Sequence, residues 1–236
     1  RLINNFCIRS KYRFGINLNS TDLIAEFENN SLNYSNIYKL LCSKIFKNKK
    51  IGITGEHAGN EWRNIKNYFK IFPKGKVIIL LRDPRDIICS FKKTTIAKKN
   101  DYLISIFNYV DLINHTFTLK KKYNKKIHIV KFNELKKNTS TVLSKVCRFL
   151  KIKYNSKMIN EKNFKGIDGK KWDQSKAFSF AGNLKKQNID RWKYIMSDED
   201  LFLCELIAKK QMKMMGLKIS GQKINEKIIK KSLKKI

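Results

Sequence analysis

The chain has 236 residues, a length that favours one domain or two small ones. Hydrophobic residues make up 42% of the chain and aromatic residues 11%, enough to build a buried core, which excludes a disordered or fibrous protein. The formal net charge is +33, from 52 basic and 19 acidic residues, so the surface will attract anions such as nucleotides and sulfated or phosphorylated molecules.

The expected secondary structure alternates between short strands and longer helices. The first 50 residues have a loosely helical pattern, best from Ile37 to Phe46. The expected strands are short and apolar: Ile51 to Thr54, Lys76 to Leu81, and Lys126 to Phe132. The expected helices are amphipathic: Glu61 to Ile71, Asp83 to about Ile96, Tyr102 to Tyr123, Thr139 to Leu150, and Ser197 to Gly216. Residues Lys151 to Asp190 are polar and irregular, and the lysine-rich tail from Ile224 to Ile236 is expected to be solvated.

This order of elements is typical of an α/β protein with a parallel sheet. We expect one domain over residues 1–217, followed by a basic tail at 218–236. The continuous apolar run KVIILL, from Lys76 to Leu81, indicates a strand buried on both faces. Ligands bind beyond the carboxyl ends of the strands in such sheets, so the residues directly after Leu81 are the first candidates for a site.

Most of the positive charge comes from lysine, because only eight of the basic residues are arginines. Lysine, isoleucine and asparagine are frequent along the whole chain, and A/T-rich codons encode all three. Surfaces that read nucleic acid usually recruit arginine, whose planar guanidinium pairs with phosphate and guanine. We therefore attribute much of the charge to genome composition and predict no specific nucleic-acid partner.

The sequence predicts no membrane span, secretory leader or metal site. The longest apolar run near the middle, Val77 to Leu81, is far too short to cross a bilayer, and Arg1 to Arg13 has no apolar leader region. The five cysteines are widely spread, without a CxxC pair or a Cys/His cluster of metal-ligand spacing. We interpret them as reduced, mostly buried thiols, which indicates a cytoplasmic location.

The segment after the second expected strand reads Arg-Asp-Pro-Arg-Asp and begins at Arg82. Asp83 and Pro84 are typical of the N-cap and first position of a helix, whose free N–H groups and dipole favour an anion. Ser90 lies about two turns into that helix. Arg82 and Ser90 could therefore grip one phosphate from two sides. A capped surface helix with an ordinary salt bridge is the alternative.

This segment resembles the 3′-phosphate-binding segment of sulfotransferases that use 3′-phosphoadenosine-5′-phosphosulfate (PAPS). In that family an apolar strand ends in Arg, Asp/Asn-Pro-Arg/Lys-Asp follows, and a Ser stands eight positions after the first Arg, as Ser90 does after Arg82. The resemblance implies that these two residues hold the 3′-phosphate of the nucleotide. The FNEL segment at Phe132 is similar to the family's Tyr-Glu-Asp-Leu, which implies that the Phe132 ring lies near the adenine.

The resemblance runs from about Ile51 to Leu217 and includes the C-terminal third. Leu184 to Lys193 is similar to the family segment in which an Arg-Lys-Gly phosphate clamp shortly precedes Trp-Lys. This implies that Lys185 and Lys186 also contact the 3′-phosphate, although Gln187 stands in place of the glycine. Two lysines on a solvated face are the alternative.

One family feature has no counterpart in this sequence. The family's Gly-containing loop, broadly Pro-Arg-Ser-Gly-Thr-Thr, cradles the 5′-phosphosulfate with backbone N–H groups, whereas Cys7 to Lys11 has Arg-Ser without a following glycine. We therefore expect the three-layer parallel α/β sheet of P-loop nucleotide-binding proteins, lacking its first strand and P-loop. Either the chain is a fragment that starts after that loop or it is a degenerate relative that lost it, and under both accounts it could bind nucleotide poorly and be inactive.

The candidate catalytic residues are His57 and Glu56, in the segment TGEHAG after the first expected strand. Sulfuryl transfer needs a base for the acceptor proton, and the family places a Lys or His in this region. His57 has an ordinary pKa of about 6.5, suited to that role. A loop histidine without a special role is the alternative for His57, and Glu56 is the second candidate base. For His128, which alternates with isoleucines on a strand, we expect a structural role.

These residues lead to one principal function and two alternatives. The principal function is transfer of a sulfuryl group from PAPS, as co-substrate and without a metal, to a hydroxyl or amine on a small-molecule or glycan acceptor. The first alternative is a non-catalytic, basic protein that binds nucleotides or polyanions. The second is a relative of P-loop kinases, which the absence of a GxxxxGK[ST] motif disfavours.

Overall fold

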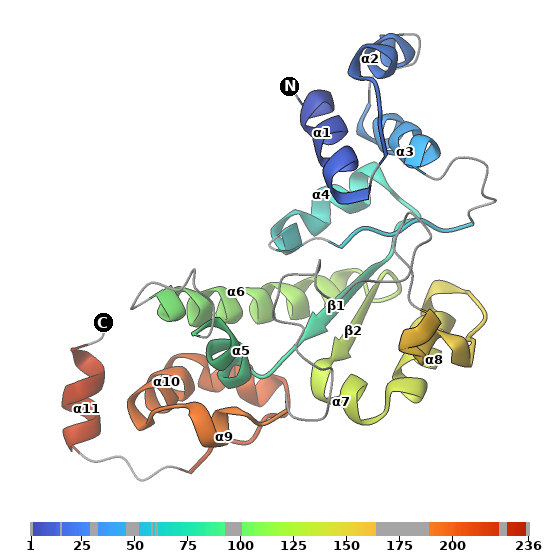
Figure 1. Cartoon of the computed structure of the whole chain (residues 1–236). Coiled ribbons are helices and arrows are strands. Elements are labelled where there is room, and N and C mark those ends of the chain that lie inside the picture. Colours follow the sequence, from blue (N-terminus) through green and yellow to red (C-terminus); the bar gives the residue numbers. More distant parts are fainter. Residues whose placement is uncertain are drawn as a thin grey trace. The chain divides into compact units, whose positions relative to one another are not determined.

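The structure, a computed structural model, describes residues 2–14, 16–28, 33–45, 52–57, 59, 61–92, 101–163, 189–221 and 226–234 (Figure 1). The chain divides into two compact units. Unit 1 comprises Arg1–Gly75 and Asn155–Ala181, and unit 2 comprises Lys76–Tyr154 and Gly182–Ile236.

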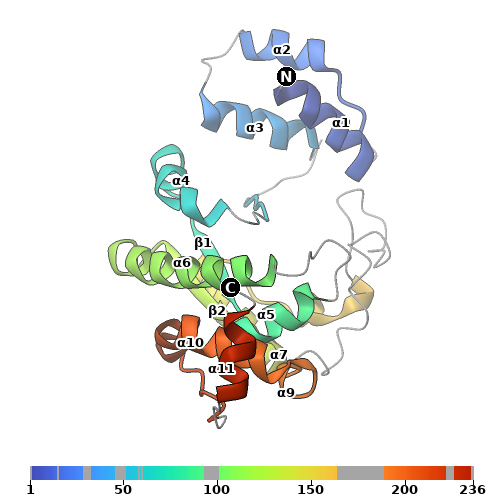
Figure 2. The same ribbon diagram turned by 90° about the vertical axis from the view of Figure 1, so that its left-hand side faces the viewer.

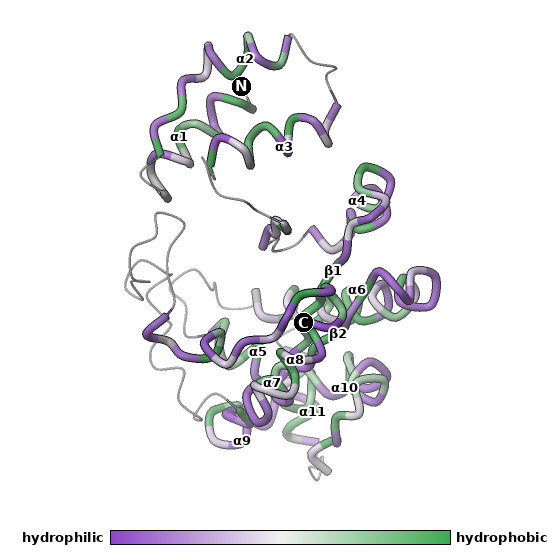
Figure 3. Tube along the Cα trace, turned by 90° about the vertical axis from the view of Figure 1, so that its right-hand side faces the viewer, coloured by the Kyte–Doolittle hydropathy of each residue, from purple (hydrophilic) through white to green (hydrophobic). Residues whose placement is uncertain are grey.

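Unit 1 begins with three helices, α1 (Leu2–Phe14), α2 (Ser20–Glu28) and α3 (Tyr34–Ile45). The expected helical character of this region is thus confirmed. Hydrophobic and hydrophilic residues alternate along these helices (Figure 3), and the hydrophobic ones form a small core of their own. Its buried members are Cys7, Leu23 and Phe27, against which Ile37, Leu40 and other partly buried side chains pack.

The prediction of a strand from Ile51 to Thr54 is wrong for the residues of this range that the structure describes. Residues 52–57 have irregular backbone, and the Ile53 side chain is 53% exposed. A strand needs a neighbour to take its backbone hydrogen bonds and to cover one face, whereas residues 52–57 are exposed and pair with no strand in the described part of the chain. The next expected helix is confirmed, as the 3₁₀ turn η1 (Glu61–Asn64) running into α4 (Ile65–Ile71).

Unit 1 also contains two short 3₁₀ turns, η2 (Ser156–Ile159) and η3 (Glu161–Asn163), in the region expected to be irregular.

Unit 2 is built on two parallel strands, β1 (Val77–Leu81) and β2 (Ile127–Lys131). They pair in register from Val77 with Ile127 to Leu81 with Lys131. The helices α5 (Pro84–Phe91) and α6 (Asp101–Lys122) lie between them in the chain, as parallel pairing requires a long crossover (Figure 1). The predicted α/β class with a parallel sheet is confirmed, in a mostly helical form whose described residues contain these two strands.

The expectation that β1 is buried on both faces is wrong. Ile79 and Leu81 are buried, with 7% and 1% of their surface exposed, whereas Ile78 and Leu80 are 42% and 52% exposed. Successive side chains of a strand point to opposite faces of the sheet, so the structure buries one face of β1 and leaves the other accessible.

The core of unit 2 forms around α6, which confirms the helix expected from Tyr102 to Tyr123. Its buried residues recur every three or four positions, because these positions share one face of a helix. They are Tyr102, Ile106, Tyr109, Ile113, Thr116 and Leu119. This face packs against α10 (Asp198–Met214), whose Leu203, Ala208 and Met212 are fully buried. The Ser197 side chain caps α10 by accepting a hydrogen bond from the Asp200 N–H at 3.3 Å, as the sequence predicts.

The remaining helices of unit 2 are α7 (Phe132–Lys137), α8 (Thr139–Leu150), α9 (Trp192–Ile195) and α11 (Glu226–Leu233). The structure confirms α8 with the expected bounds. The prediction of a solvated C-terminal tail is wrong for α11. This helix packs against α10, and its Ile228 and Ser232 are buried (Figure 2). Of the helices in the described part of the chain, none is long and apolar enough to cross a membrane.

Candidate functional site

Arg82 and Ser90 line one hollow at the carboxyl end of β1. The hollow has a volume of about 230 Å³, and Ile87 and Phe91 complete its lining. Ile87, Ser90 and Phe91 share one face of α5 because they are three and four positions apart. Arg82 reaches the same hollow because it follows the last residue of β1 and precedes the first turn of α5.

The Arg82 guanidinium lies over the ring of Phe132, with its Cζ 4.7 Å from the ring centroid. Phe132 is the first residue of α7 and directly follows β2, so the parallel pairing of the strands brings the two residues to the same edge of the sheet. Burial lowers the pKa of Arg82, while the nearby Asp86 carboxylate opposes this shift. Arginine keeps its charge in proteins, so a half-buried cation faces the hollow.

The N-terminus of α5 is capped as the sequence predicts. Pro84 occupies the first helical turn, and the Asp83 side chain accepts a hydrogen bond from the Arg85 N–H at 2.9 Å. A carboxylate of the protein thus already occupies part of this helix end. An anion in the hollow would therefore depend mainly on the side chains of Arg82 and Ser90.

The side chain of Arg85 joins several elements of unit 2, and the sequence analysis assigned it no role. Its Nη2 and Nε donate to the Asp83 carboxylate at 2.7 and 3.0 Å, and its Nη1 donates to Glu205 at 2.8 Å and to the Lys218 carbonyl at 3.1 Å. Its guanidinium also stacks on the Trp192 ring at 3.7 Å. The residue is only 3% exposed, so these contacts lock the loop between β1 and α5 against α9 and α10.

Asp86 is a second residue whose role the sequence reasoning missed. Its carboxylate is buried and accepts hydrogen bonds from the N–H groups of Asp190, at 3.2 Å, and Trp192, at 3.3 Å. Burial raises the pKa of Asp86, and these backbone hydrogen bonds and Arg82 oppose the shift. The acidic residue in the first turn of α5 was the available signal, but its partners lie more than a hundred residues away.

Arg191, between those two N–H donors, is therefore held beside the first turn of α5. Its side chain is half-buried, and its positive charge contributes to the lowering of the pKa of Arg82 by burial and opposes the rise that burial causes in the pKa of Cys89. The structure thus places Arg191 close enough to Arg82 and Cys89 for its charge to act on both.

Of the other predicted site residues, two belong to unit 1 and two lie outside the described residues. Glu56 and His57 are exposed residues of the irregular segment in unit 1, whereas Arg82, Ser90 and Phe132 belong to unit 2. Within unit 1, burial raises the pKa of Tyr38 on α3, and Glu56 contributes to this shift through its charge. Lys185 and Lys186 lie outside the described residues.

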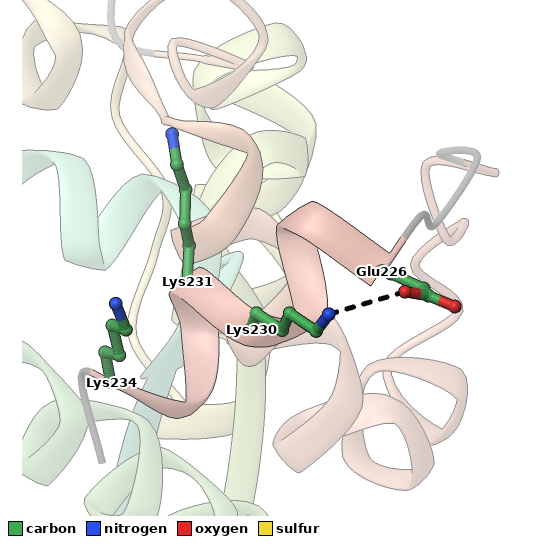
Figure 4. A pocket seen from close by; sticks show the side chains of 4 residues that line it. All are labelled: Glu226, Lys230, Lys231 and Lys234. Carbon is green, nitrogen blue, oxygen red and sulfur yellow. Dashed lines mark ion pairs between the residues drawn. The ribbon is translucent and has the colours of Figure 1, made fainter.

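A second hollow, of about 370 Å³, lies beside α11 and is lined by Glu226, Lys230, Lys231 and Lys234 (Figure 4). Lys230 turns toward Glu226, with a separation of 3.5 Å between nitrogen and oxygen, and Lys231 pairs with Glu199 at 3.6 Å. Carboxylates thus already pair with two of these lysines. All four side chains come from an exposed helix surface, and none of them is buried.

The five cysteines are free, and all but Cys42 are buried, which agrees with the prediction of mostly buried thiols. In the described ranges, no group of three or more His, Cys, Asp or Glu residues could hold a metal ion.

The comparisons with known proteins agree with this fold. The sulfotransferase domain family model matches residues 65–216, so the chain belongs to the sulfotransferase domain family. The structure is similar to the sulfotransferase domain from the curacin biosynthetic pathway, with a TM-score of 0.62, 18% identity, and coverage of 85% of this chain and 74% of that one. It is also similar to the sulfotransferase domain from the Synechococcus PCC 7002 olefin synthase, with a TM-score of 0.63, 16% identity, and coverage of 89% and 74%. No curated protein matches the sequence significantly.

Proposed function

We propose that this chain is a sulfotransferase that moves a sulfuryl group from PAPS to a hydroxyl or amine of an acceptor. The observation that carries this proposal is that Arg82 and Ser90, separated by eight residues, line one hollow at the carboxyl end of β1. We propose that these two side chains hold the 3′-phosphate of the nucleotide. A guanidinium donates several hydrogen bonds in a fixed geometry and a hydroxyl donates one more, a combination suited to a phosphate.

The surroundings of Arg82 support this role. The guanidinium packs on Phe132 and is partly removed from solvent, so its attraction to an anion is screened less than that of a lysine on the surface. The Phe132 ring that supports Arg82 is also the ring that we propose lies near the adenine. Lys185 and Lys186 are proposed to add positive charge around the same phosphate, from outside the described residues.

The chemistry requires a base at the acceptor. The acceptor oxygen or nitrogen forms a bond to sulfur, the bond between sulfur and the 5′-phosphate oxygen of PAPS breaks, and a base takes the acceptor proton. His57 is our first candidate for the base and Glu56 the second, and both side chains are exposed in unit 1. The reaction needs no metal, because the site mainly positions groups and neutralises charge.

The proposed nucleotide site can be tested by calorimetry with adenosine 3′,5′-bisphosphate, the product of PAPS. Arg82→Ala should weaken binding by about tenfold or more, because a hydrogen bond to a charged group contributes about 1.5–3 kcal/mol. Ser90→Ala should weaken it less. Lys230→Ala is the matched control, since it removes one positive charge from the α11 hollow. Equal losses in Arg82→Ala and Lys230→Ala would contradict the proposal.

Transfer itself can be tested by incubating the chain with PAPS and a panel of hydroxyl and amine acceptors, and measuring release of the bisphosphate. His57→Ala should reduce acceptor-dependent release while leaving bisphosphate affinity unchanged. If Glu56→Ala instead causes the larger loss, the base is Glu56. Release that neither substitution changes would contradict both assignments.

The alternative function is binding of polyanions without catalysis, and the lysines around the α11 hollow are the feature that favours it (Figure 4). Polyanion binding predicts a steep dependence on salt that is shared across nucleic acids, and indifference to Arg82→Ala. If ATP competes better than the bisphosphate, a kinase-like nucleotide preference would replace both functions.

A further inference from the structure

We infer that Arg191 is a third ligand of the anion bound between Arg82 and Ser90, and that Asp86 is the positioning residue that holds Arg191 there. This inference rests on the proposed function, because the anion is the 3′-phosphate of the nucleotide. It adds to the site an arginine outside the Arg-Asp-Pro-Arg-Asp segment and outside the lysine pair at residues 185 and 186.

The position of Arg191 follows from its backbone. The N–H groups on either side of it, those of Asp190 and Trp192, both donate to the buried Asp86 carboxylate. Asp190 has a φ of 58°, in the left-handed region that non-glycine residues rarely occupy. The segment is therefore held in an uncommon conformation by a carboxylate from α5, and such conformations cluster at functional sites.

Trp192 fixes the same segment from the other side. Its side chain is 9% exposed and stacks against the guanidinium of Arg85 at 3.7 Å, and Arg85 is itself tied to Asp83 and Glu205. The backbone of Arg191 thus lies between two anchors, the Asp86 carboxylate and the stack of Arg85 on Trp192. A backbone held in this way loses little further freedom when a ligand binds, which favours affinity.

The geometry of α5 directs Arg191 toward the hollow. Asp86 and Ser90 are four positions apart and share one face of the helix, and Arg82 precedes Asp86 by four positions. The segment that Asp86 anchors therefore contacts α5 one turn before Ser90 and next to Ile87, two of the residues that line the hollow. The charge of Arg191 contributes to the lowered pKa of Arg82 and opposes the raised pKa of Cys89, which is consistent with a position close to α5.

The charges also favour an anion at this point. Two guanidinium groups held close together repel each other, and Arg191 accordingly disfavours the charged form of Arg82. Asp86 attracts Arg82, but both of its oxygens accept hydrogen bonds from backbone N–H groups. A phosphate monoester, which carries close to two negative charges near neutral pH, would relieve the repulsion by pairing with both groups.

The test compares two nucleotides with the full chain by calorimetry: adenosine 3′,5′-bisphosphate and adenosine 5′-monophosphate, which lacks the 3′-phosphate. Arg191→Gln should weaken the binding of the bisphosphate by about tenfold or more and the binding of the monophosphate by less than about twofold. Arg191→Lys should restore part of the loss, because it keeps the charge without the planar guanidinium. Lys193→Gln is the matched control, since it removes an exposed charge from the same segment.

The outcomes separate this inference from the proposed function. If Arg82→Ala weakens the binding of the bisphosphate and Arg191→Gln does not, the proposed site stands and the role inferred for Arg191 is wrong. If Arg191→Gln weakens the binding of both nucleotides equally, Arg191 acts through its long-range positive charge and is not a ligand of the 3′-phosphate. If neither substitution matters, both proposals fail.

The role of Asp86 is tested separately by Asp86→Asn, which keeps one of its two carboxylate acceptors. It should reproduce the selective loss for the bisphosphate, and adding Arg191→Gln to it should cause little further loss. A variant that retains the preference for the bisphosphate would exclude Asp86 as the positioning residue. Circular dichroism and the thermal midpoint of each variant identify any loss that comes from unfolding.

Discussion

Arg82 and Phe132 meet across the carboxyl ends of β1 and β2, with the guanidinium carbon 4.7 Å from the ring centroid. The two residues are fifty positions apart, and the parallel register that pairs Leu81 with Lys131 makes them neighbours. The ring restricts the guanidinium and shields one of its faces from water. Phe132 therefore prepares Arg82 for an anion, in addition to any contact of its own with a nucleotide.

This relationship predicts that Phe132→Leu weakens the binding of adenosine 3′,5′-bisphosphate by about two- to thirtyfold, since a cation–π contact contributes about 0.5–2 kcal/mol. Phe132→Tyr should bind nearly as well as the original chain, because it keeps the ring. Calorimetry measures both affinities. A Phe132→Leu variant with unchanged affinity would mean that the ring does not support Arg82 in the bound state.

The Arg85 network predicts a large effect on stability. Arg85→Met would leave the buried carboxylates of Asp83 and Glu205 without their cation, which should lower the free energy of unfolding by about 3–5 kcal/mol. Urea unfolding followed by circular dichroism measures the change. Lys193→Met breaks an exposed ion pair with Asp190 and should change stability by less than about 1 kcal/mol. Similar small effects in both variants would show that the network contributes little.

The packing of α11 can be tested with two adjacent isoleucines. Ile228 is 9% exposed and Ile229 is 39% exposed. Ile228→Ala should destabilise the protein by about 2–4 kcal/mol, because it removes buried methyl groups at the contact with α10. Ile229→Ala should have a clearly smaller effect. Equal unfolding midpoints for the two variants would indicate that this helix does not pack as the structure shows.

His128 predicts a dependence of stability on pH. Its ring stacks on Phe149 with the centroids 5.1 Å apart, and burial, helped by Lys120 and Lys145, lowers its pKa from the ordinary value of 6.5. Below pH 6.5 the unfolded chain therefore binds a proton that the folded chain resists. The neutral His128 ring therefore costs no stability above this pH. The free energy of unfolding decreases as the pH falls from 6.5 toward the lower pKa of His128 in the folded chain.

His128→Phe should remove this part of the pH dependence while keeping an aromatic ring beside Phe149. Urea midpoints measured from about pH 7.5 to about pH 5.5 give the slope for each protein. The titration of carboxylates contributes to both slopes and cancels in the comparison. Identical slopes would show that His128 titrates alike in the folded and unfolded chain.

The most regular segments of unit 2 could be predicted from the sequence. The helices α6 and α8 have hydrophobic patterns that match the period of a helix, the strands β1 and β2 are short and mostly apolar runs, and a local cap marks the start of both α5 and α10. These signals lie within a few residues of one another, so no distant contact is needed to interpret them. The eight-residue spacing of Arg82 and Ser90 is of the same kind, because a strand end followed by a helix determines where both side chains begin.

The errors concern segments whose structure depends on a partner. Ile51 to Thr54 has the composition of a strand, but residues 52–54 pair with no strand among the residues that the structure describes. The lysine-rich tail resembles a solvated segment, yet Ile228 and Ser232 are buried against α10. Composition alone does not show whether a partner is present.

By itself, the sequence determined the order of β1, α5, α6, β2, α8 and α10, and it singled out Arg82 and Ser90, two of the residues that line the hollow at the end of β1. Only the tertiary structure decided that Asp86 holds the backbone on both sides of Arg191 and that Arg85 joins Asp83 to Glu205. Asp86 is 104 and 106 positions away from Asp190 and Trp192, and Arg85 is 120 positions away from Glu205. Hydrogen bonds form only at short distances and in narrow directions, so contacts of this kind depend on how the whole of unit 2 folds.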